Sequence, residues 1–189
     1  MGLMIHSLAE VPLEARRRYY LHMLDYGWEE PVMNTVDANF RKLASLASEN
    51  ESTVVRGLSG AHFADEVLSW HQINGQPAEG MLPAILITTG HPQDFQLGLA
   101  RKSEHQDAML LIPLRKACRS ATDVIPLLER LFEDIKKRKA LSQFRIAKEL
   151  KKGEGGAVVD AIILQPNFQG VGVDLKKVVG MFKANRASK

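Results

Sequence analysis

The sequence predicts an α/β fold, with one domain built on a mixed sheet of about four strands flanked by helices. Two nearly continuous apolar runs, at residues 84–89 and 108–114, are typical of strands covered on both faces. Segments with apolar residues at helical spacing separate the strand-like runs. The chain has 189 residues, of which 45% are hydrophobic and 25% charged, as in an ordinary globular domain.

The first fifty residues predict a pair of helices. Residues 12–27 read as an amphipathic helix that ends at Gly27, and residues 34–48 read as a second helix capped by Asn34 or Thr35. We expect this pair (1–50) to pack on the sheet formed by the remaining residues (51–189).

The rest of the chain alternates strand and helix signals. Apolar periodicity predicts strands at 52–58 and 157–164 and helices at 61–72, after Ser120, at 141–151 and at 174–184. Ser120 and Asp123 resemble a capping box at the start of one of these helices. The sequence leaves open whether strands 84–89 and 108–114 are antiparallel neighbours or are joined by a crossover.

Composition limits the environment and the chemistry. One cysteine, Cys118, excludes an intramolecular disulfide and indicates a reducing compartment. No signal peptide or membrane span is visible, so we expect a cytoplasmic protein without a membrane partner. A metal site can be drawn from His62, Glu66 and His91, but the spacing does not require one. No metal and no cofactor are therefore predicted.

Charge is distributed unevenly along the chain. Residues 1–114 carry a net charge of −6 and residues 115–189 a net charge of +9. A basic face can bind nucleic acid or another anion, whereas Lys-rich surface helices give the same pattern without a ligand. The candidate nucleic-acid or anion-binding residues are Lys136, Lys137, Arg138, Lys139, Lys148, Arg115 and Arg119.

The loop at 88–95 holds the only weak catalytic candidates, His91 and Asp94. Ligands of open α/β sheets gather beyond the carboxyl ends of strands, and this loop follows a predicted central strand. However, His-Pro is also an ordinary turn, and no nucleophile motif accompanies it. We therefore assign no catalytic residue, and enzymatic activity is uncertain and not favoured.

The N-terminal segment "RRRYYLHMLDYGW" is rich in the residue types that dominate protein interfaces. Arg17, Tyr20 and Trp28 are the candidate partner-binding residues. The sequence favours a non-enzymatic cytoplasmic component that binds another protein in a multi-subunit assembly. The alternatives are a nucleic-acid-associated accessory factor that uses residues 136–152, and a small enzyme that acts through His91 and the 88–95 loop.

Overall fold

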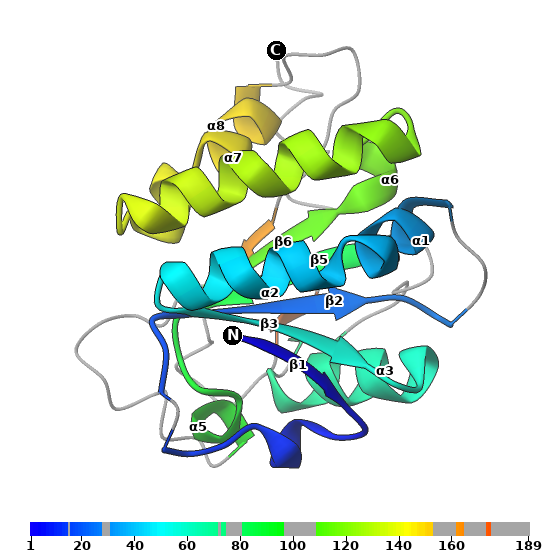
Figure 1. Cartoon of the computed structure of the whole chain (residues 1–189), viewed down its shortest axis with the longest axis vertical. Helices are drawn as coiled ribbons and strands as arrows, with labels where there is room; N and C mark the ends of the chain where they lie inside the picture. Colours follow the sequence, from blue (N-terminus) through cyan, green and yellow to red (C-terminus); the bar gives the residue numbers. More distant parts are fainter. Residues whose placement is uncertain are drawn as a thin grey trace.

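Six strands of the computed structural model form one mixed sheet in the order β1-β3-β2-β5-β6-β7 (Figure 1). Strands β1, β3 and β2 are mutually parallel, and β5, β6 and β7 each run antiparallel to the preceding strand in this order. A separate parallel pair joins β4 to β8. The strands are β1 (Gly2–Ile5), β2 (Tyr19–Leu24), β3 (Ser52–Gly57), β4 (Ile73–Asn74), β5 (Ala84–Thr88), β6 (Met109–Pro113), β7 (Ile162–Leu164) and β8 (Val173–Asp174).

The structure describes residues 1–14, 16–27, 31–71, 73–74, 81–96, 109–152, 162–164 and 173–174. Its α-helices are α1 (Pro31–Ala38), α2 (Phe40–Glu49), α3 (Gly60–Trp70), α5 (Pro92–Gln96), α6 (Leu114–Ala117), α7 (Val124–Lys136) and α8 (Arg145–Lys152). Three short 3-10 helices are η1 (Leu8–Glu10), η3 (Ala121–Asp123) and η4 (Leu141–Gln143). Within these ranges, no helix has both the length and the apolar character needed to cross a bilayer.

Helices cover both faces of the sheet. Figure 1 shows α1, α2, α7 and α8 on one face and α3 and α5 on the other. Side chains of α1, α2, α7 and α8 form one core with Leu21, Val54 and Ile85, while α3, α5 and η1 form a second core with Leu24, Val55 and Leu86. Strands β5 and β6 therefore bury both of their faces, which is why their sequences are almost continuously apolar.

The helix predicted at residues 12–27 is wrong, because this segment contains the central strand β2. All six residues of β2 are buried. Tyr19, Leu21 and Met23 enter one core, and Tyr20 and Leu24 enter the other. The strand lies between β3 and β5, so apolar residues at every position have a place to pack, and this overrides the apparent helical period.

The remaining elements agree with the predicted α/β class. Strands β3, β5 and β6 and helices α3, α7 and α8 lie where the sequence predicts them, and β5 and β6 are antiparallel neighbours. The predicted helix 34–48 consists of α1 and α2, which are separated at Asn39. Strand β7 occupies the end of the predicted strand 157–164, and most of the predicted helix 174–184 lies outside the described residues.

Close packing requires glycine at two positions in the parallel part of the sheet. A Cβ added at Gly2 would lie 2.4 Å from the Cβ of Ala44, because α2 packs directly on β1 and β3. A Cβ added at Gly57 would lie 2.2 Å from the Cβ of Phe63, because α3 packs on β3 from the other face. The two glycines therefore let helices on opposite faces approach the same pair of strands.

We expect Gly57→Ala to lower the free energy of unfolding by about 1–3 kcal/mol, because Phe63 and α3 must shift to admit the methyl group. Gly27→Ala is the contrasting variant: its backbone φ is 76°, and the added Cβ would meet no atom closer than 3.8 Å. Its cost comes only from the left-handed backbone, about 1 kcal/mol. Urea unfolding of both variants checks this order, and an unchanged midpoint for Gly57→Ala would contradict the packing at β3.

Candidate functional site

His91 and Asp94 lie where the sequence places them, after the carboxyl end of β5, but they do not form an open site. His91 is only 2% exposed, and its ring meets the edge of Tyr20 at a centroid distance of 5.4 Å. Asp94 accepts two hydrogen bonds from Arg16, at 2.6 and 3.1 Å. The histidine is thus packed in the core, and the carboxylate is held in an ion pair.

His91 belongs to a cluster of three buried histidines on the α3 side of the sheet. His22 from β2 and His71 at the end of α3 have ring centroids 5.2 Å apart, and His71 lies 4.5 Å from the Phe95 ring. The Nδ1 of His71 lies 2.7 Å from the Val67 carbonyl, and a neutral ring must donate its proton there. The Nε2 atoms of His22 and His71 and the Nδ1 of His22 lack a hydrogen-bond partner among the described residues.

These histidines are neutral near pH 7. Burial lowers the pKa of His22 well below its usual value and that of His71 to about 4, and it also lowers the pKa of His91. Neutral imidazoles can bind metal ions. Within the described ranges, however, no group of three histidine, cysteine or acidic side chains is placed to hold one. The cluster therefore makes the stability of the fold dependent on pH.

The predicted partner-binding residues do not form one exposed surface. Tyr20 is fully buried in β2, and its hydroxyl accepts a hydrogen bond from the Arg17 backbone N–H at 2.9 Å. Arg17 is half-buried at the entry to this strand, and Trp28 lies outside the described residues. Tyr20 packs in the core on the α3 side of the sheet, so its side chain is not exposed to a partner in this structure.

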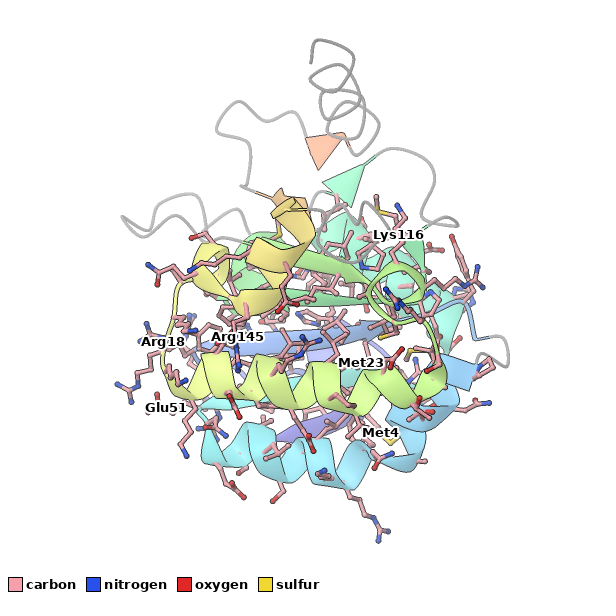
Figure 2. The ribbon with its side chains drawn as sticks, turned by 90° about the horizontal axis from the view of Figure 1, so that it is seen from above. Met4, Arg18, Met23, Glu51, Lys116 and Arg145 are labelled. Carbon is pink, nitrogen blue, oxygen red and sulfur yellow. The ribbon has the colours of Figure 1, made fainter. Side chains whose placement is uncertain are left out.

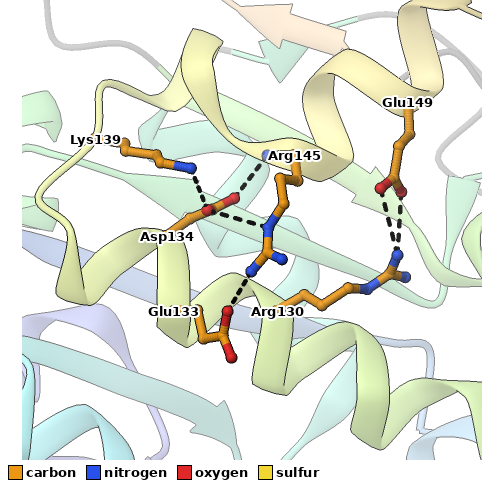
Figure 3. A network of polar contacts seen from close by, with 6 residues as sticks. All are labelled: Arg130, Glu133, Asp134, Lys139, Arg145 and Glu149. Atoms are coloured by element: carbon orange, nitrogen blue, oxygen red, sulfur yellow. Dashed lines mark hydrogen bonds and ion pairs between the residues drawn. The ribbon is translucent and has the colours of Figure 1, made fainter.

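The basic segment at 136–152 is tied to acidic residues (Figure 3). Asp134 is buried and accepts hydrogen bonds from the Lys139 ammonium and the Arg145 backbone N–H, both at 2.6 Å. Burial alone would raise the pKa of Asp134, but these hydrogen bonds outweigh it and the pKa is lowered. Arg145 also binds Glu133 at 2.6 Å.

Arg138 forms a further ion pair with Glu51, at 3.0 Å, and Arg18 donates a hydrogen bond to the Arg138 carbonyl. Figure 2 shows Arg18 and Glu51 at the same end of the molecule as Arg145. Lys136, Lys137 and Lys148 are exposed. Three of the cations at 136–152 are therefore neutralised by neighbouring acids, and their positions are explained by contacts within the chain.

The predicted anion site around Arg115 and Arg119 already contains a carboxylate. Asp123 accepts hydrogen bonds from the backbone N–H groups of Arg119 and Ser120, both at 2.9 Å, which forms the expected capping box. These bonds lower the pKa of Asp123. Burial raises the pKa of the neighbouring Cys118 thiol to about 11, so the thiol is protonated and unreactive near pH 7.

A buried ion pair joins the carboxyl ends of β2 and β3. Asp25 directly follows β2 and binds the Arg56 guanidinium of β3 at 2.6 Å, with side-chain exposures of 3% and 10%. Asp37 of α1 binds the same guanidinium at 2.9 Å from a more exposed position. This network fixes the parallel strands to each other and to the helix that follows β2.

The edge of the sheet at β1 is a candidate binding surface that the sequence analysis does not locate. β1 pairs with β3 on one side and with no described strand on the other. Its four residues, Gly-Leu-Met-Ile, carry no charge and no proline, the usual devices that block strand addition. Met4 on β1, labelled in Figure 2, is 54% exposed. Leu58, which follows β3, is 52% exposed.

Sequence reasoning missed this edge because the run from Gly2 to Ile5 is short and apolar, which is also the pattern of an interior strand. It missed the histidine cluster because His22, His71 and His91 come from three separate elements. Comparison of the chain with protein-family models, with curated proteins and with solved structures finds no match in any of the three.

Proposed function

We propose that this protein works by binding another protein chain, as a non-enzymatic subunit of a multi-subunit assembly. The other chain would bind along the β1 edge. The observation that supports this is the uncharged edge of β1, beyond which no described strand lies and on which Met4 is 54% exposed. An extended segment of another chain can add to such an edge through main-chain hydrogen bonds, with alternate side chains giving specificity.

Nucleic-acid binding and enzymatic activity are less well supported than binding of another protein. The nucleic-acid role through 136–152 is second, because Arg138, Lys139 and Arg145 already bind acids of the same chain. The enzymatic role through His91 is third, because the ring is buried in the core and is not exposed to a substrate.

The test compares chains retained by the wild-type protein and by two charge variants. In Met4→Lys the ammonium stays hydrated in the free protein but must lose water when a strand covers the edge, so we expect about a hundredfold weaker binding. Leu13→Lys is the matched control, because Leu13 is 49% exposed in the loop before β2. We expect a defined partner chain, identified by mass spectrometry, to bind wild type and Leu13→Lys and to be lost from Met4→Lys. Identical binding by all three proteins would reject the β1 interface.

A further inference from the structure

Alternate residues of β1 carry the backbone groups that face away from the sheet. The carbonyls of Met1 and Ile5 accept hydrogen bonds from the N–H groups of Val54 and Leu58, both at 2.8 Å. Odd-numbered positions therefore face β3. Because the N–H and C=O groups of one strand residue point to the same side and alternate along the strand, those of Gly2 and Met4 point outward. The edge thus presents two donors and two acceptors, centred on Leu3.

This pattern is complementary to itself. We propose that a second copy of this chain adds its own β1 to this edge, antiparallel, about a two-fold axis at Leu3; this inference rests on the proposed function. In this register Gly2 of one copy faces Met4 of the other, and each such pair exchanges two hydrogen bonds. The two-fold axis repeats the pair, so four backbone hydrogen bonds join the copies.

The side chains fit the same register. Met4 pairs with Arg56 in the sheet and lies on the face that α2 covers, opposite Gly2 of the second copy. Gly2 lies directly beneath α2, where an added Cβ would be 2.4 Å from the Ala44 Cβ and 3.2 Å from the Phe40 ring. The exposed thioether of each Met4 therefore reaches Phe40 and Ala44 of the other copy, and the pairing covers the side chain that the single chain leaves in water.

The spacing of the helices also favours a second copy over an isolated peptide. Strands lie about 4.8 Å apart, and α2 packs over β1 and β3, so the axes of α2 and its symmetry mate would lie about 10 Å apart. Helices pack at 8–10 Å where the contacting side chains are small. The flank of α2 above β1 carries Phe40 at its start, then the small residues Ala44 and, one turn later, Ser48, so the close approach would be made at Ala44 and Ser48. A second copy therefore places α2 against α2, which a lone strand cannot do.

Disulfide crosslinking at the axis tests this arrangement. Leu3 would face its own symmetry mate in a non-hydrogen-bonded pair with Cα atoms about 4.5 Å apart, within the range that a disulfide spans. We expect full-length Leu3→Cys to form a crosslinked dimer under mild oxidation. The native Cys118 is buried and does not compete. Leu58→Cys is the control, because Leu58 is exposed and lies off the axis, and we expect it to crosslink about tenfold less.

Sedimentation velocity of the unmodified chain gives the second readout. At about 100 μM we expect the wild type to sediment as a dimer, and Met4→Lys as a folded monomer with a circular dichroism spectrum like that of the wild type. Monomeric wild type, together with equal crosslinking of Leu3→Cys and Leu58→Cys, would overturn the second copy as the occupant. The proposed function would then still stand if a different chain binds wild type and is lost from Met4→Lys, and it would fail if no such chain binds.

Discussion

We expect Asp25→Ala to lower the free energy of unfolding by about 3–5 kcal/mol, because it leaves the buried Arg56 guanidinium without its closest carboxylate. The Asp25 carboxylate lies 2.6 Å from Arg56 and also accepts a hydrogen bond from the Gly27 N–H at 2.8 Å. Replacing Asp25 therefore removes the contacts that fix the loop after β2 to β3. Urea unfolding followed by circular dichroism measures the loss.

Asp37→Ala is the matched control, because it removes the other carboxylate that binds Arg56. The Asp37 side chain is 43% exposed, and Arg56 keeps its bond to Asp25, so we expect a loss of only about 1 kcal/mol. If Asp25→Ala costs no more than Asp37→Ala, burial does not decide the strength of this network. The comparison also bears on function, because β3 is the strand that holds β1 at the edge.

Acid should destabilise the protein through the buried histidines. In the unfolded chain a histidine binds its proton near pH 6.5, whereas burial lowers the pKa of His71 to about 4 in the folded protein. Below about pH 6.5 the unfolded state therefore binds more protons, and the free energy of unfolding falls as the pH falls toward 4. His71 alone contributes a loss of about 3 kcal/mol across this window, and His22 and His91 change stability in the same direction.

The variant His71→Asn isolates this effect, because its amide can donate to the Val67 carbonyl as the imidazole does but does not titrate. Unfolding curves at about pH 7, 6 and 5 should show a pH slope smaller than that of the wild type by up to about 1.4 kcal/mol per pH unit. His62→Gln provides the control variant, because it removes a histidine that is exposed and lies outside the buried cluster. Parallel pH curves for His71→Asn and wild type would show that His71 is not held neutral by burial.

The α/β class could be predicted from the sequence because its strongest signals are local. Residues 84–87 and 109–113 are apolar at every position, which is typical of a strand covered on both faces, and α7 shows an apolar stripe at helical spacing. Strand β2 carries the same apolar signal, but Tyr20 and Leu24 are also four residues apart, as on one face of a helix. Burial between β3 and β5 decides between the two readings, and that depends on contacts distant in sequence.

The candidate site depends even more on such contacts. Whether Met4 lies at an edge or inside a sheet follows from the strand order, which no short segment specifies. The run of cations from Lys136 to Lys139 suggested a binding face, but Lys139 is bound by Asp134, five residues earlier, and Arg138 by the distant Glu51. Charge counted along the chain cannot separate cations available to a ligand from those bound within the fold.

Hydrogen exchange at the Met4 backbone amide tests directly whether another chain binds along β1. Its N–H points away from β3, so in the isolated chain it should exchange rapidly, whereas Leu3 bonds to β3 and should already be protected. In the assembled state, at high concentration or with the captured partner, we expect exchange at Met4 to slow by at least about tenfold while Leu3 changes little. Equal exchange rates at Met4 in the isolated and assembled states would contradict binding at this edge.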